Sequence, residues 1–328
     1  MRTLFKVLGI LMLVVGVLAA GAVAWLSLRQ PDQRAAFAEP IERTPERVAR
    51  GEYLVRHVGI CFDCHSERSP AAFAMPFKAG RDGVGGFVWD REKGFPGVLV
   101  ASNLTPDRET GLGAWTDGEI ARAIREGVDR NGKALFPIMP YAHLRELSDD
   151  DVKAVVAYLR TLQPVRWQRP AKELDLPLNF VEKFVPKPVD GPVAAPDRND
   201  TVAYGKYLTT IGSCVECHTP KDDKDQPLPG QEFSGGWVMH GPGFEVVTAN
   251  ITPHPTNWMG IATKEQFIAR FRSYADYKEV PAANGRNTLM PWISYAGMTD
   301  EDLGAIYDYL KTVKPIEKKV NPFAQAAH

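Results

Sequence analysis

The chain has 328 residues, which is enough for two ordinary domains of roughly 100–200 residues each. Its apolar content of 44% allows each of them to bury a core. Its 39 basic residues are balanced by 40 acidic ones, so the overall charge gives no basis for nucleic-acid binding, and partners must be selected by local patches.

An uncharged apolar run covers residues 7–28. As a helix with a rise of about 1.5 Å per residue it would reach roughly 33 Å, enough for a hydrocarbon core of about 30 Å. A cleaved signal peptide is the alternative, since Ala20-Gly21-Ala22 and Ala22-Val23-Ala24 could serve a peptidase. The uninterrupted length favours a retained transmembrane anchor over residues 1–30, because a secretory core usually has about 7–15 residues. Under either interpretation the rest of the chain is exported.

Two five-residue motifs follow, Cys61-Phe62-Asp63-Cys64-His65 and Cys214-Val215-Glu216-Cys217-His218, and together they use all four cysteines. At this spacing two thiols can add to the vinyl groups of a haem while the adjacent His binds the iron. A zinc site, a redox pair and ordinary disulfides are the alternatives. Paired zinc motifs usually lie about 15–20 residues apart, whereas 150 positions separate these two, and neither a redox pair nor a disulfide explains the His. The sequence therefore predicts two covalently bound haem c groups.

The motifs belong to an internal repeat, since several other segments also occur twice in the same order. The later segments are offset by 147 and 151 positions, so the two copies are collinear with small loop differences. The repeated segments are Gly51-Glu52-Tyr53-Leu54 with Gly205-Lys206-Tyr207-Leu208, Asn103-Leu104-Thr105-Pro106 with Asn250-Ile251-Thr252-Pro253, Met139-Pro140-Tyr141 with Met290-Pro291-Trp292, and Ala157-Tyr158-Leu159 with Asp308-Tyr309-Leu310.

Each copy is predicted to consist of helices joined by long loops. A lead helix covers residues 47–57 in the first copy and enters the first motif. Middle helices begin at Thr116 and Thr263, where an acid or amide three residues later completes a capping box. The last helix starts at Ser148, and Pro164 and Pro315 end the last helices. Apolar residues at helical spacing predict its buried face: Val152, Val155, Val156, Leu159 and Leu162, repeated as Leu303, Ile306, Leu310 and Val313.

The sixth ligand of each iron is predicted to be a thioether. Met139 lies 74 residues after His65, and Met290 lies 72 residues after His218. Both are followed by Pro, whose fixed φ suits a loop that presents its neighbour rigidly, and then by an aromatic residue. A single Met is usually core filler, but two Met at matching positions favour ligation, which closes the iron and raises its potential.

Other residues could ligate iron but do not recur at equivalent places. Met75 also precedes a Pro, yet it lies only ten residues after His65 and has no counterpart in the second copy. We expect the remaining candidates to be surface or loop histidines: His57, His143, His240 and His254.

Both copies resemble class I cytochrome c domains, because the Gly51/Tyr53/Leu54 and Tyr158/Leu159 segments, like Gly205/Tyr207/Leu208 and Tyr309/Leu310, match the crossing terminal helices of that family. The resemblance implies an all-α fold of two tandem domains, residues 46–166 and 201–316, joined by the Pro-rich linker 167–200 and followed by the tail 317–328. It also assigns Cys61, Cys64, Cys214 and Cys217 to haem attachment, and His65, Met139, His218 and Met290 to the irons.

The run from Asn103-Leu104-Thr105-Pro106-Asp107 through Trp115 resembles, more narrowly, cytochrome c subunits of bacterial membrane-bound alcohol, aldehyde and gluconate dehydrogenases. The chain differs from them in having two haem motifs where three are common, and in an N-terminal anchor. The resemblance implies a dihaem electron carrier of the bacterial inner membrane, with its haem domains in the periplasm. It would accept electrons from a dehydrogenase or respiratory donor and pass them to an acceptor such as an oxidase, so its partners would be redox proteins.

Two further functional interpretations stay open. A dihaem peroxidase, or a small-molecule oxidoreductase such as a thiosulfate dehydrogenase, would need one iron without a sixth ligand, and the Met pair argues against that. The dihaem subunit of a terminal oxidase is barely separable from the first interpretation by sequence. We expect an electron-transfer subunit rather than a stand-alone enzyme, with no catalytic residue of its own.

Overall fold

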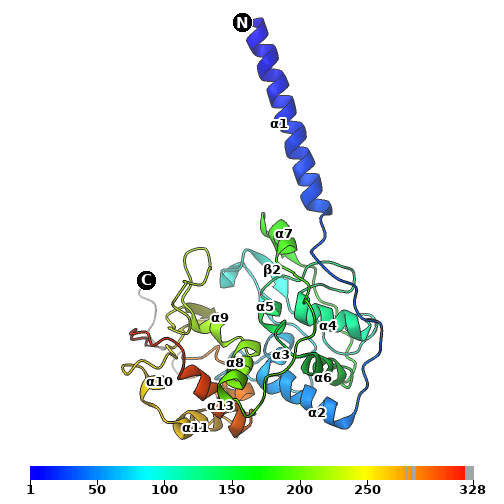
Figure 1. Cartoon of the computed structure of the whole chain (residues 1–328). Coiled ribbons are helices and arrows are strands. Elements are labelled where there is room, and N and C mark those ends of the chain that lie inside the picture. The colour runs from blue at the N-terminus through cyan, green and yellow to red at the C-terminus, as the bar shows by residue number, and fades with distance from the viewer. Residues whose placement is uncertain (278–279, 283–285, 322–328) are drawn as a thin grey trace.

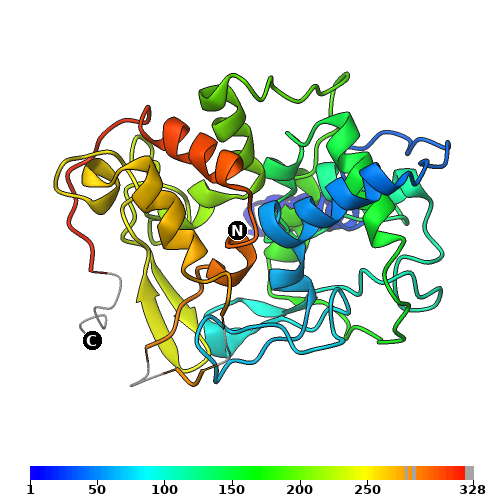
Figure 2. The ribbon, with the colours of Figure 1, turned by 90° about the horizontal axis from the view of Figure 1, so that it is seen from below.

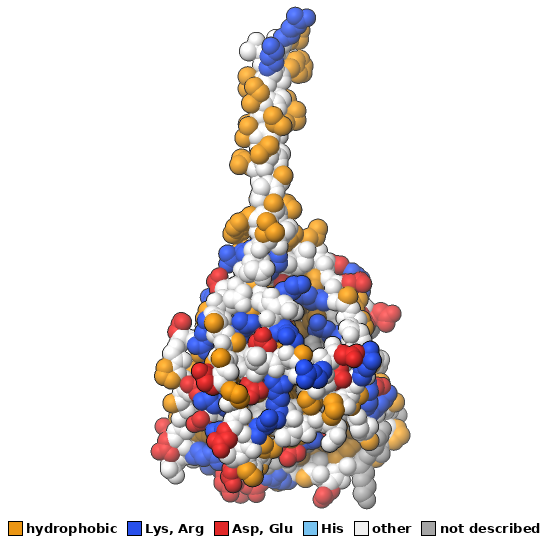
Figure 3. All heavy atoms as spheres, turned by 90° about the vertical axis from the view of Figure 1, so that its right-hand side faces the viewer, with side chains coloured by type: hydrophobic (Ala, Val, Ile, Leu, Met, Phe, Trp, Pro, Cys, Tyr) orange, Lys and Arg blue, Asp and Glu red, His pale blue; other side chains and the backbone are white. Residues whose placement is uncertain are grey.

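The computed structural model describes residues 1–277, 280–282 and 286–321, and it consists of a projecting N-terminal helix and a folded body (Figure 1). Helix α1 spans Arg2–Leu28, and none of its residues is buried. Apolar side chains cover it along its length, whereas the body shows acidic and basic side chains intermixed (Figure 3). The helix is long and apolar enough to cross a membrane, a test that a signal sequence would also pass.

The first copy of the repeat begins with the lead helix α2, which continues as a π-helix, η1, into the motif helix α3. The predicted lead helix is confirmed, but it starts two residues earlier, at Pro45, and its last turn is wider than an α-helical one. The elements are α2 Pro45–Tyr53, η1 Leu54–Val58, α3 Cys61–His65, β1 Val88–Trp89, η2 Arg91–Lys93, β2 Gly97–Val100, α4 Asp117–Glu126, α5 Tyr141–Leu144 and α6 Asp149–Leu159.

A connecting segment and the second copy follow in the same order of helices. The connection contains a short strand and a short helix, β3 Glu173–Leu174 and α7 Leu178–Val181, with the 3₁₀ turn η3 Glu182–Phe184. The second copy contains α8 Thr201–Ile211, α9 Cys214–His218, β4 Val238–Gly241, β5 Phe244–Val247, α10 Trp258–Ile261, α11 Lys264–Arg272, α12 Trp292–Tyr295 and α13 Asp300–Leu310.

The predicted helix starts are confirmed by their caps. Thr116 and Thr263 each accept a hydrogen bond from the backbone N–H of the third residue of the following helix, and that residue's side chain accepts one from the Thr N–H. Ser148 caps α6 and Thr299 caps α13, each by accepting a hydrogen bond from the backbone N–H of the third residue of its helix. Such a cap contributes on the order of 1 kcal/mol to helix stability.

The lead and last helices of each copy approach until their backbones touch. A Cβ built on Gly51 would lie 1.9 Å from the carbonyl oxygen of Ala154, and one built on Gly205 would lie 1.9 Å from that of Ala305. Only glycine fits at such a contact. The crossing implied by the resemblance is therefore present in both copies, and each motif helix follows its lead helix directly.

The all-α expectation was incomplete, because two small antiparallel sheets lie among the long loops. Strands β1, β2 and β3 form a three-stranded sheet in that order, and β4 pairs with β5. The strands have only two to four residues, too few to produce a recognisable alternation in the sequence. Strand β3 comes from the predicted linker, so the linker is tied to the first copy by pairing of Gly97 with Leu174.

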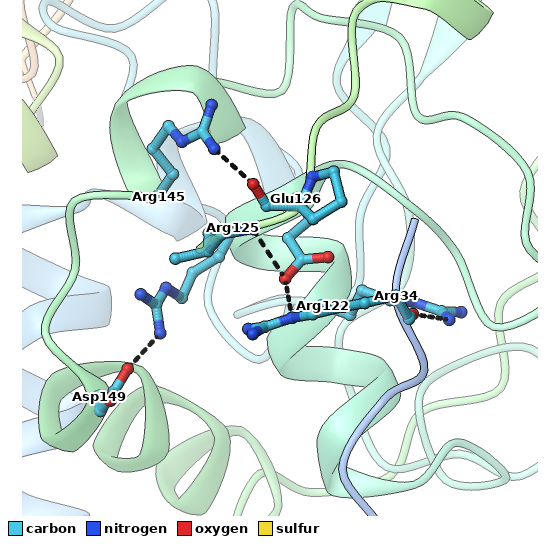
Figure 4. Close-up of polar contacts among 8 residues, drawn as sticks. Arg34, Arg122, Arg125, Glu126, Arg145 and Asp149 are labelled. Carbon is cyan, nitrogen blue, oxygen red and sulfur yellow. Dashed lines mark hydrogen bonds and ion pairs between the residues drawn. The ribbon is translucent and has the colours of Figure 1, made fainter. Parts of the chain in front are cut away.

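Polar contacts in Figure 4 also tie the connecting segments to the first copy. Glu126, only 2% exposed, accepts a hydrogen bond from Arg34 of the spacer after α1 (2.7 Å) and one from the backbone N–H of Val189 (3.3 Å). Arg145 donates to the Pro188 carbonyl at 2.8 Å. The Pro-rich linker is therefore held against the first copy by hydrogen bonds.

The two copies pack side by side, as the view from below shows (Figure 2). Their apolar residues form one continuous buried cluster, which includes Leu54 of the first copy and Leu208 of the second. Equivalent tyrosines of the lead helices cross the interface in both directions. Tyr53 donates to Asp302 (2.7 Å), and Tyr207 donates to Asp151 (2.6 Å). The repeat therefore forms a pseudo-symmetric pair with a shared core.

We predict that Gly205→Ala destabilises the haem-loaded chain by about 1–3 kcal/mol, since overpacking a close helix contact forces the backbones apart. Gly304→Ala is the control, because it lies inside α13 but its new Cβ would meet only side-chain ends, Lys264 Cδ at 3.4 Å and Ile268 Cδ1 at 4.0 Å. Replacing an interior helix Gly by Ala there should be neutral or favourable. Guanidinium unfolding followed by circular dichroism gives the free energy of unfolding of both variants. Equal losses in the two variants would contradict the idea that the helix crossing requires glycine at position 205.

Candidate functional site

Each Cys-x-x-Cys-His motif forms one helical turn directly after the lead helix. Left-handed residues, Ile60 at φ 43° and Ser213 at φ 54°, set the bend before the first cysteine. This conformation is unfavourable for a β-branched residue such as Ile60, and strained backbone of this kind is typical of functional sites. The turn places both cysteines and the His of each motif within five residues of helix.

The motif histidines are oriented by backbone carbonyls. His65 Nδ1 lies 2.8 Å from the Ser102 carbonyl oxygen, and His218 Nδ1 lies 2.7 Å from that of Ala249. Because a carbonyl only accepts, Nδ1 carries the proton and Nε2 keeps a free lone pair for a metal. Burial lowers the pKa of both imidazoles, which favours the neutral form that ligation requires.

The repeated Asn-x-Thr-Pro segment fixes those carbonyls. Asn103 directly follows Ser102, and its side-chain Nδ2 donates to the Val165 carbonyl beyond α6 at 2.8 Å. Its side-chain Oδ1 accepts from the backbone N–H of Thr105. Asn250 makes the same contacts with Ile316 and Thr252. This motif, which carried the narrower resemblance, therefore clamps the loop that orients each His to the chain after the last helix.

No disulfide joins the four cysteines. Burial raises the pKa of Cys61, Cys64 and Cys214 to about 12, and that of Cys217 to about 11. Within the described part of the chain, no group of three or more His, Cys, Asp or Glu is placed so that it could hold a metal ion.

Met139 and Met290 occupy the same backbone position in their copies. The residue after each Pro donates its N–H to the Met carbonyl at 2.8 Å, closing a turn around Pro140 (φ −79°, ψ 44°) and Pro291 (φ −79°, ψ 60°). These angles are near those of an inverse γ-turn. Both side chains are half-buried against the shared core. The same Met-Pro turn is thus present in both copies, and presentation of the Met as an iron ligand stays a prediction.

The set of donors fits a haem c in each copy. Two thiols one helical turn apart, an oriented neutral imidazole and a half-buried thioether are the groups that such a cofactor needs. The other candidates have different partners. Met75 is buried at a left-handed position, and four histidines contact other groups: His57 lies against the Ser294 carbonyl, His143 against Glu216, His240 against Glu245 and His254 against Thr256.

Sequence reasoning missed the acids inside the motifs. Asp63, 6% exposed, accepts a hydrogen bond from Ser294 of the other copy at 2.6 Å. Glu216 occupies the equivalent place and lies 2.7 Å from His143 Nε2, again across the interface. The signal was present, since both motifs carry an acid directly before the second cysteine. Each motif therefore touches the helix that follows the other copy's Met-Pro turn.

Comparison with known proteins gives a consistent result. Residues 202–314 match the cytochrome c family model. The chain is 32% identical over 290 residues to the cytochrome c subunit of the quinone alcohol dehydrogenase of Gluconobacter oxydans, covering 84% of this chain and 56% of that protein. It is 27% identical over 297 residues to the gluconate 2-dehydrogenase cytochrome c subunit of Pantoea cypripedii, covering 85% and 62%.

The chain thus spans about six-tenths of the length of these dehydrogenase subunits. A diheme cytochrome c-type protein of Cereibacter sphaeroides matches over nearly its whole length, with 28% identity over 319 residues that cover 92% of this chain and 96% of that protein. Residues 202–314 therefore match the cytochrome c family, and the chain as a whole is similar to cytochrome c subunits and to a diheme cytochrome c-type protein.

Proposed function

We propose that each copy is a class I cytochrome c domain, residues 46–166 and 201–316, with one covalent haem. The paired cysteines would hold the porphyrin through thioethers, the Nε2 atoms of His65 and His218 would bind the irons, and the Met139 and Met290 sulfurs would fill the sixth positions. The observation that carries this proposal is the duplication itself: two copies place the same donors on the same backbone geometry. Bound haem would supply a one-electron carrier.

We propose further that the chain is an electron-transfer subunit. It would accept electrons from a periplasmic dehydrogenase or respiratory donor and pass them to an acceptor such as an oxidase. The relatives support this role, because several of them are named as cytochrome c subunits of dehydrogenases. The chain's own contribution is to attach the carrier, keep its imidazole ligand neutral and oriented, and close the iron with a sulfur.

Retention of α1 as a membrane anchor is supported by its contacts with the body. Lys183 donates to the carbonyl oxygens of Leu26 and Ser27 at 2.9 and 2.8 Å, which satisfies groups left free at the helix end. The Trp25 ring lies 6.1 Å from that of Phe184, and Arg29 lies over the Phe184 ring at 4.4 Å. A segment removed on export would not need these contacts, which supports a retained anchor. We propose that this anchor lies in the inner membrane and that the body lies on its periplasmic side.

Two haems per chain is the first expected outcome. The denatured mass of the exported protein should exceed the mass of its polypeptide by two haems. Replacing Cys214 and Cys217 by Ala should leave one haem. A mass equal to that of the bare polypeptide would contradict the proposal.

The Met assignment predicts a spectroscopic change. Met139→Ala or Met290→Ala should each remove about half of the weak long-wavelength sulfur-to-iron band of the oxidised protein, lower the potential of that haem and open its iron to carbon monoxide. Met75→Ala is the control and should leave the band intact. Loss of the band in Met75→Ala would instead identify Met75 as a sulfur ligand of an iron.

The anchor predicts that the protein stays in the membrane fraction after high-salt and carbonate washes. Replacing residues 1–28 by a cleavable secretion signal should release a soluble dihaem protein. Sequencing the mature N-terminus provides the check, because a start near residue 23 or 25 would identify the segment as a signal peptide.

A further inference from the structure

The loop that carries Met290 is held on its N-terminal side by the first copy. Asn287 lies three residues before Met290 and is 4% exposed. Its Nδ2 donates to the carbonyl oxygens of Pro70 and Ala72 at 3.2 and 3.0 Å, and its Oδ1 accepts from the backbone N–H of Ala74 at 2.8 Å. One buried amide thus makes three hydrogen bonds to the loop that follows the first haem motif.

The same loop is held on its C-terminal side by the first motif. Ser294, 5% exposed, lies on α12 four residues after Met290 and donates to Asp63 at 2.6 Å. Its carbonyl oxygen lies 2.8 Å from His57 Nδ1. Asp63 stands between the two cysteines of the first motif and also pairs with Arg68 at 3.2 Å. A buried contact therefore joins the helix beside Met290 directly to the first haem motif.

Met139 is held mostly within its own copy. Phe136, which takes the place of Asn287, packs edge-on against Phe95 with ring centroids 5.2 Å apart, and Tyr141 donates to the Leu135 carbonyl at 3.3 Å. Among the described residues, α5 packs against α8 of the second copy, and its side-chain hydrogen bond across the interface is that of His143 with Glu216, whose side chain is 47% exposed. An exposed pair of this kind contributes little to stability.

We propose that the first copy positions Met290, so that the sulfur ligand of the second haem depends on the first domain, whereas Met139 depends little on the second. This inference rests on the proposed ligation by Met290. Nineteen residues lie between the end of α11 and the start of α12, and a connection of that length needs anchors to hold one side chain in place. Asn287 and Ser294 are the anchors, and the side chains of both form hydrogen bonds with the first copy.

The test reads one haem at a time in the full haem-loaded chain. In a Met139→Ala background the sulfur-to-iron band reports Met290 alone, and in a Met290→Ala background it reports Met139. Asn287→Ala is introduced into both, with Ser294→Ala as a second variant in case the first does not fold. The slow phase of carbon monoxide binding to the reduced protein measures how often the remaining Met leaves its iron.

We expect Asn287→Ala to accelerate that slow phase roughly fivefold to thirtyfold in the Met139→Ala background, the effect of losing one or two kcal/mol of loop stabilisation. The same substitution should leave the slow phase unchanged in the Met290→Ala background. Equal acceleration in both backgrounds would show general destabilisation and overturn the inference, as would no change in either. A Met139→Ala protein without any band would overturn the ligand assignment itself, and this inference with it.

Discussion

The close approach of the lead and last helices is the constraint on which each copy depends. Because Gly51 and Gly205 have no side chain, two helices cross with their backbones in contact, and the motif turn follows within ten residues. The first cysteine thereby follows a lead helix whose position is fixed by packing against the last helix. Asn103 and Asn250 then bind the loop whose carbonyl orients the motif His to the chain just beyond the last helix of the same copy. The last helix therefore supports both the motif cysteines and the orientation of the His.

The second level of organisation is the pairing of the copies. Tyr53 and Tyr207 reach the first turn of the other copy's last helix, and the acids of both motifs reach the helix after the other copy's Met-Pro turn. The duplication thus produced an interface between the functional parts of the two copies. The pairing is unequal, because the contact of Asp63 is buried and that of Glu216 is exposed, which gives the two sites different dependence on their neighbour.

Local sequence signals predicted much of this arrangement. The features that depend on long-range contacts could not be predicted from the sequence. The motif spacing, the caps at Thr116 and Thr263 and the matching Met-Pro turns are all visible within a few residues. The short strands leave no periodicity, and Asn287 meets residues more than two hundred positions earlier in the chain. Nothing in the local sequence around Asn287 marks such a contact, and no equivalent exists in the first copy, where Phe136 stands. The all-α prediction was incomplete for the same reason.

Electron transfer by two closed irons is the central claim, and the spin state of the oxidised wild-type protein tests it most directly. Electron paramagnetic resonance of the full haem-loaded chain should show two low-spin ferric centres in equal amounts, because each iron would have an imidazole and a thioether. A high-spin ferric signal equal to half or more of the total haem would contradict the account. One iron would then be open in the resting protein, as a catalytic centre requires.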